Sequence, residues 1–121
     1  MIGHIKTVAV YVEDQARSLE FYTGKLGFEL RRNQSMGPGG SWIEVAPPGA
    51  QTCLVLYPRG LMTDWAERKG SIVFACEDAE RTCAALSAKG VAIAEPARRM
   101  KWGTYAKFLD PDGNEFLVVS S

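Results

Sequence analysis

The chain has 121 residues, of which 46% are hydrophobic and 23% charged, a composition typical of an ordinary globular protein. Fourteen basic residues balance fourteen acidic ones, so nothing in the charge favours a nucleic acid or an anionic membrane as partner. No secretion signal opens the chain and no apolar run approaches the roughly 18 residues that span a bilayer, so we expect a cytoplasmic protein.

The first half of the chain predicts a strand, a helix and three further strands. Residues 5–13 are β-branched and apolar, which favours a strand. Asp14 is a suitable N-cap, and apolar side chains at helical spacing follow it until Gly27, where the helix is expected to end. Turns rich in glycine and proline then separate three strands, which are expected over residues 28–34, 41–46 and 51–58.

The second half predicts the same series of elements. Residues 59–70 link the two halves, and a short helix is expected within them around Met62–Arg68. A strand and a helix follow, and then three strands, the last two joined by a tight turn at Asp110–Asn114. The expected ranges are 71–77 for the first strand, 79–89 for the helix, and 91–95, 103–109 and 114–119 for the remaining strands.

The two halves also match in sequence. Setting TVAVYVEDQARSLEFYTGKLGF from Thr7 beside SIVFACEDAERTCAALSAKGV from Ser71 places Glu13-Asp14 on Glu77-Asp78. The order of the structural signals agrees as well, which is stronger evidence than short identities. The sequence therefore predicts one α+β domain, residues 1–121, built from two βαβββ modules. The modules are expected over residues 5–58 and 71–120, with residues 59–70 as the linker.

Strand alternation assigns the side chains of each module's first strand to two faces. One row is expected to pack under the helices and consists of Val8, Val10 and Val12 in the first module and Ile72, Phe74 and Cys76 in the second. Because helices cover one face only, the opposite face must be covered by something else or border a cavity. Two related sheets that curve around a shared cleft would satisfy both modules.

Two stretches of the chain resemble a known superfamily. The run VAVYVEDQARSLEFYTGKLGFEL is similar to the first strand and helix of the vicinal oxygen chelate superfamily, which comprises glyoxalases, bleomycin-resistance proteins and extradiol dioxygenases. The run FLDPDGNEFLVV resembles the C-terminal hairpin of that superfamily. The resemblance implies paired modules with curved mixed sheets around a cleft. It does not identify a reaction, because this fold hosts several chemistries as well as sequestering proteins.

In the metalloenzymes of this superfamily, histidine and glutamate side chains hold a divalent ion. Carried over position by position, the four ligand sites fall on residues that are not competent ligands, namely Thr7, Val55, Ser71 and Leu117. The only histidine, His4, is expected on the other face of the first strand. Glu115 shares the face of Leu117, whereas the face of Glu44 is ambiguous. We therefore expect no metal ion and no cofactor.

Without a metal, the cleft is expected to be a largely apolar pocket with a few hydroxyl groups, as small-molecule sites usually are. Trp42 and Trp102 are expected near strand or loop ends, where they could stack on a planar ligand. A basic loop, residues 98–102, could attract an anionic group. Alternatively, these side chains fill the core or meet a partner subunit. The candidate ligand-binding residues are Thr7, Ala9, Tyr11, Trp42, Val55, Tyr57, Ser71, Val73, Trp102, Glu115 and Leu117.

The leading hypothesis is a non-catalytic protein, similar to bleomycin-resistance proteins, that binds or sequesters an apolar or aromatic small molecule in the clefts of a homodimer. One alternative is a metal-dependent lyase, isomerase or dioxygenase with an atypical ligand set, such as Glu44 and Glu115. Another alternative is a structural or regulatory module with a filled cleft. No catalytic residue is assigned, because Ser71 has no histidine to activate it.

Overall fold

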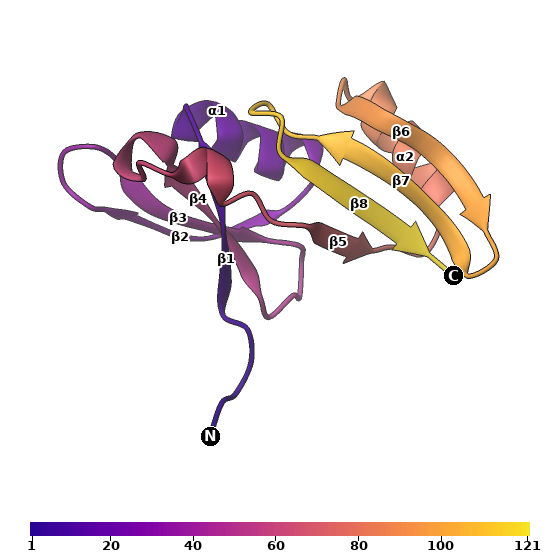
Figure 1. Ribbon diagram of the computed structural model, residues 1–121, viewed down its shortest axis with the longest axis horizontal. Coiled ribbons are helices and arrows are strands. Elements are labelled where there is room, and N and C mark those ends of the chain that lie inside the picture. Colours follow the sequence, from indigo (N-terminus) through magenta and orange to yellow (C-terminus); the bar gives the residue numbers. More distant parts are fainter. The chain divides into compact units, whose positions relative to one another are not determined.

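The computed structural model describes residues 1–121 and separates into two compact units, Met1–Lys69 and Gly70–Ser121. Each unit contains one four-stranded mixed sheet and one α-helix (Figure 1). We refer to them as unit 1 and unit 2. The boundary falls at the C-terminal end of the segment that was predicted to link the two modules. None of the helices is long and apolar enough to cross a membrane.

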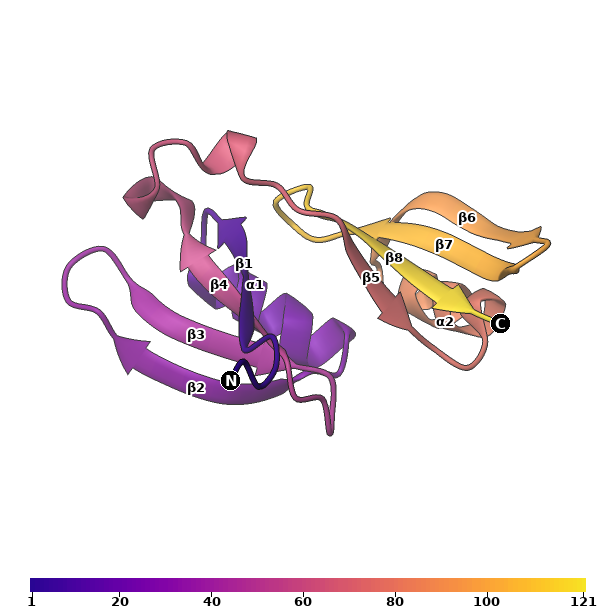
Figure 2. The same cartoon turned by 60° about the horizontal axis from the view of Figure 1, so that its bottom comes forward.

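Unit 1 has the predicted series of a strand, a helix and three strands. Its sheet has the order β1-β4-β3-β2, in which β1 runs parallel to β4 and the other neighbours are antiparallel (Figure 2). Helix α1 continues into one π-helical turn, η1, and two short 3₁₀ turns, η2 and η3, follow the last strand. The elements are β1 Thr7–Val12, α1 Gln15–Glu20, η1 Phe21–Lys25, β2 Glu29–Ser35, β3 Ser41–Ala46, β4 Cys53–Pro58, η2 Arg59–Leu61 and η3 Trp65–Glu67.

Unit 2 repeats this arrangement strand for strand. Its sheet has the order β5-β8-β7-β6, again with the first strand parallel to the last and the remaining pairs antiparallel. The elements are β5 Ile72–Ala75, α2 Ala79–Ala88, β6 Ala92–Met100, β7 Gly103–Leu109 and β8 Glu115–Ser120. The predicted α+β fold of two βαβββ modules is therefore confirmed.

The two helices begin in the same way, at the acidic residues that the internal repeat aligns. The Asp14 side chain accepts a hydrogen bond from the backbone N–H of Arg17 at 3.0 Å, and Asp78 accepts one from Arg81 at 3.1 Å. Each bond satisfies a backbone donor that has no partner within the helix. Both Asp residues are thus N-caps, as their position before an apolar helical pattern predicts.

The predicted helix-facing rows contribute to the core of each unit. In unit 2, Phe74 stacks on Phe108 and Phe116 with ring centroids 6.4 and 5.4 Å apart. In unit 1, the strand residues pack with aromatic side chains from η1, where Tyr22 is fully buried. The buried side chains of unit 1 include Val10, Val12, Phe21, Tyr22, Ile43, Val45, Leu54 and Leu56.

The predicted tight turn between β7 and β8 is organised by one carboxylate. Asp110 Oδ1 accepts hydrogen bonds from the backbone N–H groups of Asp112 at 2.9 Å and Asn114 at 2.8 Å. Asp110 Oδ2 accepts a third bond, from Asn114 Nδ2 at 2.8 Å. Side chains that bind the backbone in this way favour turns over continued strands.

One expectation about local structure was wrong. The strand expected over residues 91–95 continues to Met100, so Arg98 and Arg99 are not in a loop but in β6, paired with Tyr105 and Thr104. Pro96 lies within this strand, and proline is tolerated there because β6 is the edge of its sheet. Within the range Met62–Arg68, where a short helix was expected, the chain forms the 3₁₀ turn η3, and η2 precedes it.

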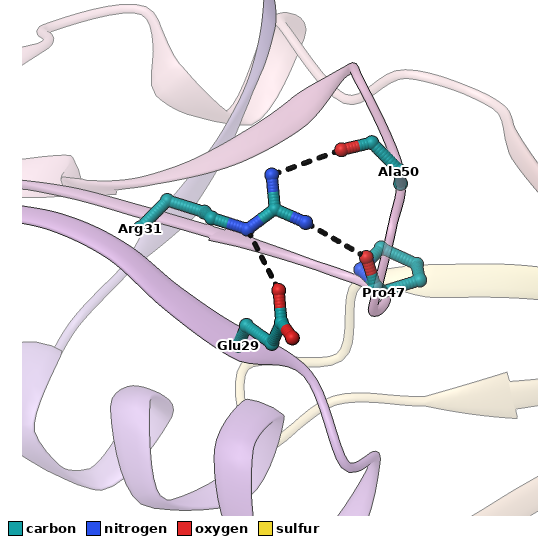
Figure 3. Close-up of polar contacts among 4 residues, drawn as sticks. All are labelled: Glu29, Arg31, Pro47 and Ala50. Atoms are coloured by element: carbon teal, nitrogen blue, oxygen red, sulfur yellow. Dashed lines mark hydrogen bonds and ion pairs between the residues drawn. The ribbon is translucent and has the colours of Figure 1, made fainter.

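One arginine of unit 1 joins β2 to the turn between β3 and β4. Arg31 lies at an irregularity in the β2–β3 pairing. Its guanidinium donates hydrogen bonds to the carbonyl oxygens of Ala50 at 2.9 Å and Pro47 at 3.1 Å, and its Nε is 3.0 Å from Glu29 Oε1 (Figure 3). Arg31 therefore ties together segments that are 16 and 19 residues apart in the chain.

We expect Arg31→Ala to lower the free energy of unfolding by about 1–2 kcal/mol, because two turn carbonyls lose their donor. Urea denaturation measures the change. The matched control is Arg32→Ala, because Arg32 is exposed and binds only the Gln34 side chain, and its effect should stay within about 0.5 kcal/mol. Equal effects of the two substitutions would show that the bonds to the turn do not stabilise the protein.

Candidate functional site

Strand pairing defines the face of the unit 1 sheet that lies opposite the buried, helix-facing row. Paired residues on neighbouring strands project from the same face of a sheet. Tyr11 pairs with Tyr57, Ala9 with Val55, and Val55 in turn with Glu44. We call this surface the open face of unit 1, and it consists of Thr7, Ala9, Tyr11, Arg32, Gln34, Trp42, Glu44, Cys53, Val55 and Tyr57. All six candidate ligand-binding residues of unit 1 lie on it.

Three aromatic side chains form a row across the open face of unit 1, from β3 through β4 to β1. The ring centroids of Trp42 and Tyr57 are 6.2 Å apart, and those of Tyr57 and Tyr11 are 6.0 Å apart. Both pairs meet edge to face, with interplanar angles of 82°. This geometry is favourable because the positive edge of one ring meets the negative face of the next. We call these three residues the aromatic row.

The Glu44 side chain lies beside the aromatic row. It is therefore on the open face of the sheet, which the sequence alone left ambiguous. It is paired with Val55 on one side and with Arg32 on the other. Only 9% of Glu44 is exposed, and its Oε2 accepts a hydrogen bond from Trp42 Nε1 at 2.7 Å. A nearly buried carboxylate thus orients the Trp42 ring.

The segment after β4 contacts one end of the aromatic row. Arg68 Nε is 2.8 Å from Asp64 Oδ1, and this hydrogen bond lowers the pKa of Asp64. The same bond is the main cause that raises the pKa of Arg68, and a hydrogen bond with Tyr11 adds a smaller contribution. In the same segment the guanidinium of Arg59 packs over the Trp65 ring at 4.6 Å from its centroid. Trp65 is half-buried there.

The corresponding open face of unit 2 is more polar. Val73 pairs with Leu117, and Leu117 with Lys107. A hollow of about 110 Å³ opens here and is lined by Gly70, Ser71, Ile72, Lys107, Glu115, Phe116 and Leu117. The structure therefore brings Ser71, Glu115 and Leu117 together, and Val73, which is 52% exposed, lies on the same face.

A cluster on this face of unit 2 was not predicted from the sequence. Lys107 Nζ is 3.0 Å from Glu95 Oε2, and the Tyr105 hydroxyl donates to Glu95 Oε1 at 3.3 Å. The hydrogen bond between Lys107 and Glu95 raises the pKa of Lys107 and lowers the pKa of Glu95. Trp102, in the turn between β6 and β7 and 61% exposed, stacks on Tyr105 with centroids 6.0 Å apart. Side-chain alternation along β7 predicts that Tyr105 and Lys107 lie on the same face as Leu117. It does not predict that Glu95 lies beside them.

Residues 2–118 match the family model of the Glyoxalase/Bleomycin resistance protein/Dioxygenase superfamily. The chain belongs to this superfamily. The resemblance drawn from the strand–helix run and the C-terminal hairpin is therefore confirmed.

Similar proteins support membership of the superfamily. The chain is 48% identical over 118 residues to the uncharacterized protein YetH of Bacillus subtilis (strain 168), covering 98% of each. It is similar to the crystal structure of a superfamily member from Sphaerobacter thermophilus DSM 20745, with a TM-score of 0.89 and 31% identity over 99% of this chain and 98% of that one. It is also similar to TnmS3, an antibiotic binding protein from Streptomyces sp. CB03234, with a TM-score of 0.85 and 34% identity over 98% and 96% of the two chains.

The residues at the ligand positions implied by the superfamily's metalloenzymes do not fit a transition metal. In unit 1 these positions hold Thr7 and Val55, and in unit 2 they hold Ser71 and Leu117. Neutral hydroxyl and hydrocarbon side chains do not replace the imidazole and carboxylate ligands that such ions prefer. Nowhere in residues 1–121 do three or more His, Cys, Asp or Glu side chains gather in a group that could hold a metal ion.

Proposed function

We propose that this protein binds, and thereby sequesters, an apolar or aromatic small molecule without the help of a metal ion. The observation that carries the proposal is the aromatic row on the open face of unit 1, next to the small side chains of Ala9 and Val55. Aromatic side chains beside small apolar ones, with few polar groups, are the usual lining of small-molecule sites. The likeness to TnmS3, an antibiotic binding protein, supports the same function.

Each residue type on the open faces has a distinct role in this proposal. The rings of Tyr11, Trp42 and Tyr57 contribute apolar area and fix the orientation of a planar ligand. The small, exposed side chain of Ala9 leaves room beside the rings, and Thr7 contributes a hydroxyl group. The open face of unit 2, taken by itself, offers apolar contacts from Val73 and Leu117, polar groups from Ser71 and Glu115, and the ring of Trp102.

The proposal includes a homodimer in the cytoplasm. Strands β1 and β5 are both edge strands of their sheets, so each has one side with backbone groups that no strand of its own sheet satisfies. Such edges favour pairing with another strand. Light scattering on the purified protein tests this part, with twice the mass of one chain as the expected result and the mass of one chain as the contrary one.

A thermal-shift screen tests the binding function. We expect at least one member of a panel of neutral aromatic compounds with one to four fused rings to raise the unfolding temperature. A ligand present at 100 times its Kd stabilises the native state by about 2.7 kcal/mol, which is readily measured. Polar non-aromatic compounds of similar mass serve as controls. Two results would each contradict the proposal: no shift with any aromatic compound, or a stoichiometric transition metal in protein purified without chelator.

A further inference from the structure

One acidic group on the open face of unit 1 has an incomplete set of partners. Glu44 is 9% exposed, yet its only hydrogen bond is the one that Oε2 accepts from Trp42 Nε1 at 2.7 Å. The other oxygen, Oε1, has no donor within the chain. No buried side-chain oxygen of the chain lacks a hydrogen-bond partner, so this unpartnered oxygen is one that solvent reaches. Glu44 Oε1 is therefore available to a ligand.

The nearest arginine on the sheet does not neutralise Glu44. Arg32 occupies the paired position on β2, but its Nε donates to Gln34 Oε1 at 3.1 Å, and it forms no ion pair with Glu44. Arg68, which contacts Tyr11 at the far end of the aromatic row, is engaged with Asp64. Arg32 and Arg68 thus have other partners, and Glu44 forms no ion pair within the chain.

The rings beside Glu44 favour a positive charge as well. Trp42 carries the N–H that binds Glu44, and Tyr57 and Tyr11 follow it across the sheet. The faces of such rings attract cations through their quadrupoles, and Trp and Tyr do so better than Phe. A carboxylate beside Trp and Tyr rings is a combination that recognises an ammonium group.

We propose that the small molecule bound at the open face of unit 1 is an alkylamine that carries an aromatic ring, in its protonated form, whose N–H group donates to Glu44 Oε1 while its hydrocarbon part lies against the aromatic row. This inference rests on the proposed binding function and specifies the chemical class of the ligand. Glu44 then selects the ligand by charge, whereas Tyr57 and Tyr11 select it by shape. Trp42 serves both purposes, since its indole also fixes the carboxylate.

Three probes of the same shape but different charge test the inference: 1-naphthylmethylamine, which is a cation near neutral pH, neutral 1-naphthylmethanol, and anionic 1-naphthoate. Isothermal titration calorimetry gives their Kd values for the full chain. A charge-assisted hydrogen bond should make the amine bind about 10- to 100-fold tighter than the alcohol. The naphthoate should bind more weakly than the alcohol.

Two variants test whether Glu44 causes the preference for the amine over the alcohol. Glu44→Gln keeps the shape of the side chain and an acceptor for Trp42 but removes the charge, so the amine and the alcohol should then bind within about twofold of each other. Arg32→Gln is the matched control on the neighbouring strand, and it should retain the preference for the amine.

Three results would overturn the inference. Equal affinities of the amine and the alcohol for the unmodified protein would do so without any variant, and would leave the proposed binding function standing. A preference for the amine that survives in Glu44→Gln would place the recognition elsewhere. Failure of all three probes to bind would contradict both the inference and the proposed function.

Discussion

Replacement of Tyr57 by alanine is expected to weaken the binding of neutral aromatic ligands by about 30-fold, which corresponds to about 2 kcal/mol. Tyr57 is the centre of the aromatic row and contacts both Tyr11 and Trp42. Its removal deletes one ring and leaves the two others without their edge-to-face partner. A single substitution should therefore disturb the whole ligand surface of unit 1. Calorimetric titration with 1-naphthylmethanol, well below the unfolding temperature of the variant, measures the effect.

Tyr57→Phe is the control for this prediction. The Tyr57 hydroxyl forms no hydrogen bond in the structure, so the phenylalanine variant keeps both ring contacts and should bind with nearly unchanged affinity. Alanine and phenylalanine variants that bind equally well would show that the ligand does not use the aromatic row. In that case the ligand surface would have to lie outside the open face of unit 1.

The largest effect on stability is expected for Gly103→Ala at the start of β7. Gly103 has a φ of +149°, a conformation that side chains with a Cβ rarely adopt. A Cβ at this position would lie 2.2 Å from the carbonyl oxygen of Ser120 on the neighbouring strand β8. Because the contact is with backbone, no side-chain rotation relieves it, and the β7–β8 pairing must shift. We expect a loss of about 3–5 kcal/mol in the free energy of unfolding.

Gly60→Ala is the matched control for Gly103→Ala. A Cβ at position 60 meets no atom within 4 Å, and the backbone there does not have a positive φ. Its effect should stay within about 0.5 kcal/mol. Urea denaturation of both variants measures the difference, and a Gly103→Ala protein as stable as the control would show that β7 and β8 do not approach so closely in solution.

Much of the fold could be predicted because its signals are local and occur twice. Asp14 and Asp78 precede apolar helical patterns, and Gly27 and Gly90, with φ of +72° and +84°, follow the helices in left-handed conformations that favour glycine. The side-chain alternation of β1 and β4 was sufficient to place Tyr11 and Tyr57 on a common face. The same alternation separated Val10 and Val12 from them.

The remaining features depend on pairing between strands, which residue spacing does not reveal. The β6–β7 pairing shifts twice, between Ile93 and Glu95 and between Glu95 and Arg98, so the contact of Glu95 with Lys107 could not be deduced from alternation. The face of Glu44 depends on its pairing with Val55, because β3 carries both polar and apolar side chains on that face. The most informative polar group of the site was therefore left ambiguous by the sequence.

The proposed binding of a small molecule without a metal ion is tested by titration of metal-free protein. Protein treated with a chelator and then dialysed is titrated calorimetrically with 1-naphthylmethanol, beside an untreated sample. We expect saturable binding with the same Kd in both samples. Binding that disappears after chelation and returns with one equivalent of a transition metal would contradict the claim.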